Sequence, residues 1–157
     1  MTPAIDSLKK LGIDHQIHKY QVDDQGEGYG LAAAKALNVA PNQLFKTLII
    51  ATEADSSTLA VAIVPVSKQL SLKHAAVTLG WKKAVMANQI KAQKATGYIL
   101  GGISPLGQKK SLPMMIDQSC QQFDIIYVSA GKRGMQVSLN TNELIKRLNI
   151  TTAHITG

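Results

Sequence analysis

Two apolar segments separated by a short polar stretch constrain the fold of this chain more than any other feature of its sequence. The first covers residues 44–51 and the second covers residues 58–66, and most side chains in both are apolar. A strand that is apolar on both faces belongs in the middle of a sheet, where both faces are covered. The polar residues 53–57 between the two segments are typical of a turn. We therefore predict a buried antiparallel hairpin at the centre of the protein.

Helices and short strands are predicted on both sides of this hairpin. Helix starts are indicated by capping residues, such as Thr2 before Pro3 and Asn140 three residues before Glu143, and several helix ends by glycines. No linker or repeat divides the chain, so we expect one domain over residues 1–157. Helices interspersed with short strands predict an α+β domain with a curled, mixed sheet. The expected helices are residues 3–11, 31–37, 72–79, 89–96 and the stretch after Asn140, and the expected strands are 15–20, 84–86, 98–100, 114–117, 125–129 and 135–139.

The composition sets broad limits on function. A formal net charge of +7 favours contact with phosphate groups, whereas an aromatic content of only 4% argues against an extended stacking platform for single-stranded bases. The N-terminus shows no secretory signal and no apolar run approaches the ~18 residues of a membrane span, so we expect a cytoplasmic protein. Cys120 is the only cysteine, which excludes an internal disulfide. We expect its thiol to be a buried apolar bystander, and we predict neither a metal site nor a cofactor.

Two glycine-containing segments with basic ends suggest a binding site. In the first, residues 96–110, an apolar run leads into Gly101-Gly102, then a Ser-Pro-Leu-Gly turn, and ends in Lys109-Lys110. The second, residues 126–134, runs from an apolar strand into Gly131-Lys132-Arg133-Gly134. Glycine lets the backbone approach a ligand, and neighbouring cations favour an anionic one. The alternative is a pair of hairpin turns with solvated basic ends, but two such segments in one small domain favour a pocket.

The familiar enzyme signatures are missing. The chain has no GxSxG, Walker, GxGxxG or HExxH motif, and His74 and His154 stand alone in the sequence. Lys46 is a cation at the start of an apolar strand. Its long side chain could simply reach the surface, or it could face a cleft and polarise a carbonyl or phosphate oxygen. An enzyme of this kind would rely on positioning and electrostatics, and the polar stretch 23–28 could either cover its site or be a plain surface loop.

Three motifs carry a family resemblance over essentially the whole chain. They are Phe45-Lys46-Thr47-Leu48, the segment 96–110, and Ile126-Tyr127-Val128-Ser129 with the glycines and cations of residues 131–134. Together these motifs resemble the YbaK/EbsC family of aminoacyl-tRNA editing proteins. The resemblance implies a mostly antiparallel, curled sheet or partial barrel flanked by helices, and an enzyme with Lys46 as its key residue. It places these further residues in the substrate pocket: Tyr20, Tyr29, Thr47, Tyr98, Gly101, Gly102 and Ser129.

The same resemblance implies a substrate and a mechanism. The expected reaction removes cysteine from tRNA(Pro), and the expected attacking group is the thiol of that cysteine, which would displace the tRNA and leave a thiolactone. Four cations are expected to contact phosphates near the acceptor end of the tRNA: Lys109, Lys110, Lys132 and Arg133. Prolyl-tRNA synthetase is a further candidate partner. Tyr29 and Gln136 depart from the residues common in the family, so editing of Ala- or Ser-tRNA stays open, as does a non-catalytic module that binds tRNA or a synthetase.

Overall fold

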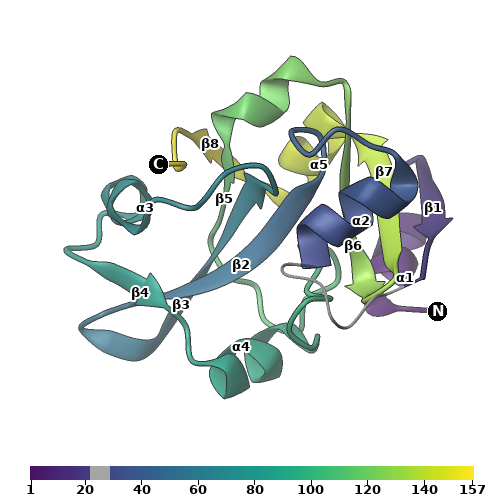
Figure 1. Cartoon of the computed structure of the whole chain (residues 1–157). Helices are drawn as coiled ribbons and strands as arrows, with labels where there is room; N and C mark the ends of the chain where they lie inside the picture. The colour runs from purple at the N-terminus through teal and green to yellow at the C-terminus, as the bar shows by residue number, and fades with distance from the viewer. Residues whose placement is uncertain (22–28) are drawn as a thin grey trace.

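The structure is a computed structural model that describes residues 1–21 and 29–157, so the predicted loop 23–28 lies outside it. The predicted hairpin is formed by β2 (Phe45–Thr52) and β3 (Asp55–Pro65), which pair antiparallel and run from the centre of the molecule to one edge (Figure 1). Every residue of β3 from Leu59 to Pro65 is buried, as expected for a strand covered on both faces. The hairpin forms part of a five-stranded sheet of order β4-β2-β3-β5-β8, completed by β4 (Ala84–Met86), β5 (Met114–Asp117) and β8 (Thr151–Ala153).

A second sheet has three antiparallel strands in the order β1-β7-β6. Its strands are β1 (His15–Lys19), which is the predicted edge strand, β6 (Ile125–Lys132) and β7 (Met135–Asn140). The two sheets meet just before β2, where Leu44 forms a parallel bridge with Tyr127. They do not close into a barrel, and β5 runs parallel to both β3 and β8. The predicted α+β class with a mixed sheet is confirmed, and its strands are divided between two sheets.

Four of the five described helices begin and end at capping residues. The described helices are α1 (Pro3–Leu11), α2 (Tyr29–Leu37), α3 (Leu72–Leu79), α4 (Gln89–Thr96) and α5 (Thr141–Leu148). Thr2 Oγ1 accepts a hydrogen bond of 3.2 Å from the Ile5 amide at the start of α1. Asn140 Oδ1 likewise accepts one of 2.9 Å from the Glu143 amide at the start of α5. Left-handed glycines end α1, α3 and α4, which confirms the sequence signals for these boundaries. None of these helices is long and apolar enough to cross a membrane.

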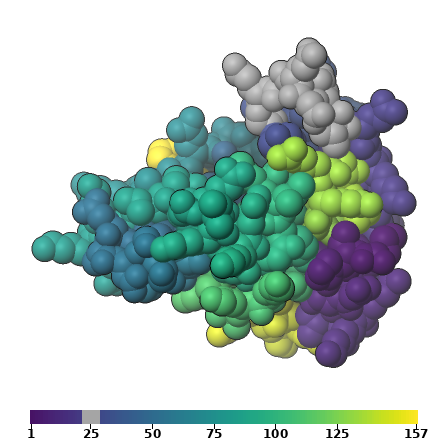
Figure 2. All heavy atoms as spheres, turned by 90° about the horizontal axis from the view of Figure 1, so that it is seen from below, coloured from purple at the N-terminus to yellow at the C-terminus, as the bar shows by residue number. Residues whose placement is uncertain are grey.

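The prediction of a strand at residues 98–100 is wrong. Gly97 ends α4 in the left-handed conformation, and the chain turns at once, with the Gly102 amide donating to the Ile99 carbonyl at 3.0 Å. Tyr98 enters the core while Ile99 is exposed, so the apolar run is shared between interior and surface. Seen from below, α4 and the following loop (teal) lie in the middle of the surface, between the hairpin (blue) and the N-terminal residues (purple) (Figure 2). This loop, residues 97–113, is called the α4–β5 loop below.

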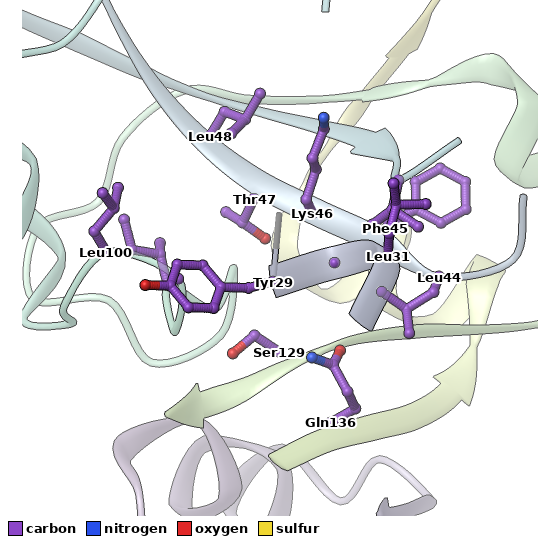
Figure 3. A pocket seen from close by; sticks show the side chains of 14 residues that line it. Tyr29, Leu31, Leu44, Phe45, Lys46, Thr47, Leu48, Leu100, Ser129 and Gln136 are labelled. Atoms are coloured by element: carbon purple, nitrogen blue, oxygen red, sulfur yellow. The ribbon is translucent and has the colours of Figure 1, made fainter. Parts of the chain in front are cut away.

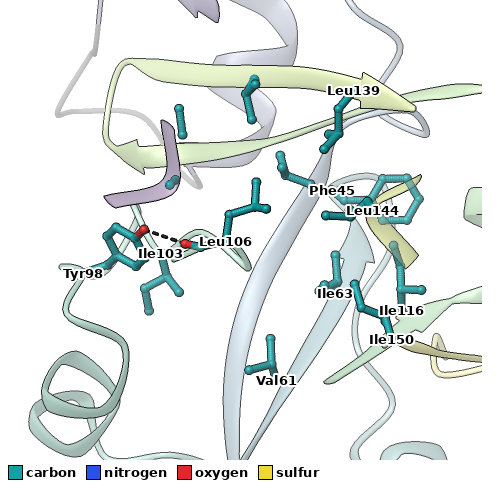
Figure 4. Close-up of a cluster of buried hydrophobic side chains, with 14 of the residues drawn as sticks. Phe45, Val61, Ile63, Tyr98, Ile103, Leu106, Ile116, Leu139, Leu144 and Ile150 are labelled. Atoms are coloured by element: carbon teal, nitrogen blue, oxygen red, sulfur yellow. Dashed lines mark hydrogen bonds between the residues drawn. The ribbon is translucent and has the colours of Figure 1, made fainter. Parts of the chain in front are cut away.

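The core lies on both faces of the five-stranded sheet. The main cluster fills the space between the two sheets (Figure 4) and includes Phe45, Ile63, Ile116 and Leu139. A second cluster covers the opposite face, where α3 packs on the sheet. A third, smaller cluster under α2 consists of Ala33, Ala34, Leu44 and Val66. Helix α2 is thereby held over the start of β2 and the end of β3, beside the second sheet.

Candidate functional site

A pocket of about 280 Å³ opens where the start of β2 meets α2, the α4–β5 loop and the second sheet (Figure 3). It is formed by segments that lie far apart in the sequence. Side chains from both sheets line it, and most of them are apolar. The lining residues are Tyr29, Gly30, Leu31, Leu44, Phe45, Lys46, Thr47, Leu48, Val66, Leu100, Gly101, Ile103, Ser129 and Gln136.

Five of the residues expected in the substrate site line this pocket together. They are Tyr29, Lys46, Thr47, Gly101 and Ser129, and they come from α2, β2, the α4–β5 loop and β6. These are the segments that carry the three sequence motifs, with α2 in addition. The structure therefore brings the motifs to one place.

Three other residues expected in the site, Tyr20, Tyr98 and Gly102, do not line the pocket. Tyr20 lies behind the pocket wall, where its hydroxyl accepts a hydrogen bond of 3.2 Å from Nε2 of the lining residue Gln136. Tyr98 lies in the core and donates its hydroxyl proton to the Leu106 carbonyl at 2.6 Å, and burial raises the pKa of this hydroxyl to about 12. Tyr98 thus fastens the α4–β5 loop from inside.

Gly102 touches protein rather than the pocket. A Cβ at this position would lie 2.9 Å from the Cα of Lys132, so the α4–β5 loop packs directly on the turn between β6 and β7. The two glycine-containing segments that the sequence singled out are therefore in contact with each other. A glycine is needed at position 102 because any Cβ there would collide with the Lys132 backbone.

Lys46 lines the pocket as the one lysine among its described lining residues. Successive side chains of a strand point to opposite faces, and in Figure 3 the Lys46 side chain lies on the other side of β2 from Thr47. Burial lowers the pKa of the Lys46 ammonium below the ordinary lysine value. Within residues 1–21 and 29–157 its ammonium makes no ion pair. A cation that is partly removed from water and not neutralised by a carboxylate is suited to stabilise an oxyanion.

Two buried oxygen atoms in the pocket wall have no hydrogen-bond partner among the described residues. They are Oγ1 of Thr47 and Oε1 of Gln136, on side chains that are 8% and 6% exposed. Leaving such atoms unpaired costs free energy, which a ligand with a suitable donor would recover. Ser129 differs, since its hydroxyl accepts a 3.1 Å hydrogen bond from the Gly131 amide. Gln136 was not among the expected site residues, although a polar residue inside the buried strand β7 was a signal for it.

The four cations expected to contact tRNA lie in two places. Lys109 and Lys110 are exposed where the α4–β5 loop returns to α4, and their amides donate to the last carbonyls of that helix at 3.1 and 2.9 Å. Lys132 is the last residue of β6, and Arg133 lies in the turn between β6 and β7. The Arg133 guanidinium contacts the pocket wall, as described below.

The remaining candidate groups lie outside the pocket. Cys120 is fully buried, and burial raises the pKa of its thiol to about 11, so it is not an activated nucleophile. His74 and His154, which stand alone in the sequence, lie close together in space, with ring centroids 4.8 Å apart. Among the described residues, no group of three or more His, Cys, Asp or Glu side chains is placed to hold a metal ion.

The fold and the pocket define a class of protein. The family model for the aminoacyl-tRNA editing domain matches residues 30–147, which include most of the pocket wall, and the chain belongs to this family. The resemblance inferred from the three motifs is thereby confirmed.

Individual relatives agree with this assignment. The chain is 38% identical over 125 residues to EbsC of Enterococcus faecalis, a protein named for a proposed Cys-tRNA(Pro)/Cys-tRNA(Cys) deacylase activity, and the match spans 80% of this chain and 75% of EbsC. A solved structure described as a proposed trans-editing enzyme for prolyl-tRNA synthetase has a TM-score of 0.86 at 18% identity, covering 99% of this chain and 95% of that one. The hypothetical protein APE2540 has a TM-score of 0.86 at 19% identity, covering 99% of both chains. At these identities the two structures support the fold.

Proposed function

We propose that this editing domain, residues 1–157, is a deacylase that acts in trans and removes cysteine from mischarged tRNA(Pro). The observation that carries the proposal is the pocket itself. It is small, it contains one partly buried cation, and two unsatisfied oxygens lie in its wall, while none of the described residues that line it carries a carboxylate, imidazole or thiol. Such a pocket can hold and polarise an aminoacyl ester, but its described lining residues offer no strong nucleophile or base. The name of the relative EbsC supports the choice of substrate.

In the proposed reaction the substrate supplies the nucleophile. The cysteine sulfur forms a bond to its own ester carbonyl carbon, the bond from that carbon to the ribose oxygen breaks, and the thiol proton goes to the departing oxygen. The products are uncharged tRNA and cysteine thiolactone. Lys46 would stabilise the negative charge that develops on the carbonyl oxygen. The apolar wall would fold the side chain so that sulfur and carbonyl carbon lie within reach of each other.

The acceptor end of the tRNA is the partner that this proposal requires. Lys109, Lys110 and Lys132 are the cations proposed to contact its phosphates, and the cytoplasm is the compartment in which they would meet. Delivery of the substrate by prolyl-tRNA synthetase is a further part of the proposal. It is supported only by the description of the similar solved structure, which is that of another protein.

A panel of charged tRNAs tests the proposal. Single-turnover deacylation is measured with Cys-, Ser- and Ala-tRNA(Pro) and with Cys-tRNA(Cys), each against spontaneous hydrolysis in buffer. We expect fast loss of cysteine and sharply slower loss of serine and alanine, because a hydroxyl is a poorer nucleophile at neutral pH and a methyl group is none. The Cys120→Ala variant is expected to keep near-full activity.

The panel also separates the alternatives. Comparable turnover of Ala-tRNA(Pro) would contradict attack by the substrate thiol and point to water or a tRNA hydroxyl. Preference for Ser- or Ala-tRNA would make the protein an editing enzyme for another amino acid. Tight tRNA binding with no deacylation of any member would favour the non-catalytic module.

A further inference from the structure

Arg133 makes three contacts with the wall of the pocket although it does not line the pocket. Its Nε and Nη2 atoms both donate to the carbonyl oxygen of Leu100, at 3.0 and 2.8 Å. Its Cζ atom lies 4.3 Å from the centroid of the Tyr29 ring, in the geometry of a cation–π contact. Leu100 and Tyr29 are both lining residues and lie together on one side of the pocket (Figure 3). One guanidinium thus holds the α4–β5 loop and the first residue of α2 together.

Gly101 fits this arrangement. It has a φ of 85°, in the left-handed region, and a Cβ there would lie 2.7 Å from Cδ2 of Tyr29 and 2.9 Å from Nε of Arg133. The space beside Gly101 is therefore filled by the stacked ring and guanidinium. The absence of a side chain at Gly101 therefore makes room for Tyr29 and Arg133 as well as for the pocket.

We propose that Arg133 is a positioning residue for the editing reaction, which fixes Tyr29 and Leu100 as one rigid wall of the aminoacyl pocket. The inference rests on the proposed deacylase function. A planar guanidinium can stack on a ring while two of its N–H groups share one carbonyl, and a lysine ammonium cannot do both. The role of Arg133 therefore depends on its shape, whereas a phosphate contact would depend mainly on its charge.

Arg133→Lys separates the two roles because it keeps the positive charge and removes the planar guanidinium. We expect its single-turnover rate at saturating protein to fall on the order of 3- to 30-fold, the range of cation–π contacts from exposed to desolvated sites. The Kd for tRNA and its salt dependence should stay as in the wild type. Arg147→Lys is the matched control, since Arg147 is exposed on α5. The assay uses whichever charged tRNA the wild type deacylates fastest.

Two further measurements complete the test. Tyr29→Leu should lower the rate by itself, and adding Arg133→Lys to it should cost little more, because both changes break the same contact. Hydrogen exchange in peptides from the α4–β5 loop should be faster in Arg133→Lys than in the wild type or Arg147→Lys, since the guanidinium no longer holds the Leu100 carbonyl. Exchange does not require the protein to act on any tRNA, so it remains informative if the proposed substrate is wrong.

The outcomes are distinct. Unchanged exchange in Arg133→Lys would overturn the wall contact whatever the activity. Faster exchange with a wild-type rate at saturation would overturn the positioning role. If Arg133→Lys behaves as the wild type and Arg133→Ala loses only tRNA affinity, with a salt slope lower by about 0.7–0.9, Arg133 is a phosphate contact. Absence of deacylation by the wild type would contradict the proposed function, and exchange alone would then decide whether the wall contact exists.

Discussion

Lys46 combines two properties that oppose each other in most proteins. It lies in a strand whose other residues are mainly buried, and it carries an ammonium group that burial penalises, as its lowered pKa shows. No carboxylate among the described residues pairs with it. Packing alone would favour an apolar residue at this position, so we propose that the lysine serves a function in the pocket. The same contrast, one cation in an apolar strand, was visible in the sequence.

Replacing Lys46 tests that reason directly. Lys46→Ala should lower the single-turnover rate by about 10²–10³, the usual cost of removing one group that stabilises an oxyanion. Circular dichroism and denaturant unfolding should show that the fold is intact. Lys46→Arg, which keeps the positive charge, is the comparison. An unchanged rate in Lys46→Ala would remove this residue from the mechanism.

The pH dependence of stability follows from the direction of the pKa shift. The pKa of Lys46 is lowered in the folded state, so at neutral pH its protonated form favours the unfolded state. Wild-type protein should therefore gain stability relative to Lys46→Met as the pH rises through the lowered pKa towards the ordinary value near ~10.4. Denaturant unfolding of both proteins across this range measures the difference, and a constant difference would contradict it.

At the scale of elements, the α4–β5 loop has the largest influence on the site. It supplies Leu100, Gly101 and Ile103 to the pocket, and it is fastened by Tyr98 from inside and by Arg133 from outside. It also packs on the first turn of α1. A Cβ at Gly107 would lie 2.5 Å from the Pro3 carbonyl oxygen.

Gly107→Ala should therefore cost more stability than its backbone conformation alone explains. Gly107 and Gly80 have nearly the same φ, 66° and 73°, but a Cβ at Gly80 would meet nothing within 4 Å among the described atoms. Gly80→Ala thus measures the cost of the left-handed conformation, and the excess in Gly107→Ala measures the clash. We expect an excess of about 1–3 kcal/mol in the free energy of unfolding, the usual range for overpacking. Equal losses in the two variants would show that the loop can move away from α1.

Prediction from the sequence succeeded for most local signals, and the apolar run 98–100, which forms a turn and not a strand, is the exception. Caps and glycines gave the helix ends, and apolar runs gave the central hairpin. The division of the strands into two sheets, the parallel pairs of β5 and the short strand β8 depend on contacts between distant residues, which leave no local pattern. The same limit applied to the site. Its motif residues were recognised, but Leu44 and Val66 have the character of ordinary core residues, and the contact between Arg133 and Tyr29 depends on tertiary structure.

At the scale of the whole molecule, the excess of positive charge is the property most relevant to a tRNA partner. The net charge is +7, and the ion pair found among the described residues joins two exposed side chains, Lys83 and Glu53. Exposed ion pairs contribute little to stability. The excess charge would favour the tRNA that we propose as the partner.

Neutralising Lys109 and Lys110 together tests where that partner binds. If both bind phosphates, the double alanine variant should bind tRNA more weakly, and the slope of log K against log salt concentration should decrease by about 0.7–0.9 for each phosphate that is no longer neutralised. Alanine replacement of Lys82 and Lys83, an adjacent pair beside β4, removes the same charge elsewhere and should leave the slope nearly unchanged. Equal effects of the two double variants would indicate a general effect of charge.

The pocket lies on the seam between the two sheets, which are joined there by the bridge from Leu44 to Tyr127. An aminoacyl group in the pocket would touch β2 on one side and β6 and β7 on the other, and so act as a removable cross-link between them. Separation of the sheets would then first require release of the ligand, and occupancy would raise the free energy of unfolding by RT ln(1 + [L]/Kd). Substrate would thus hold together the two halves of the fold that form its own binding site.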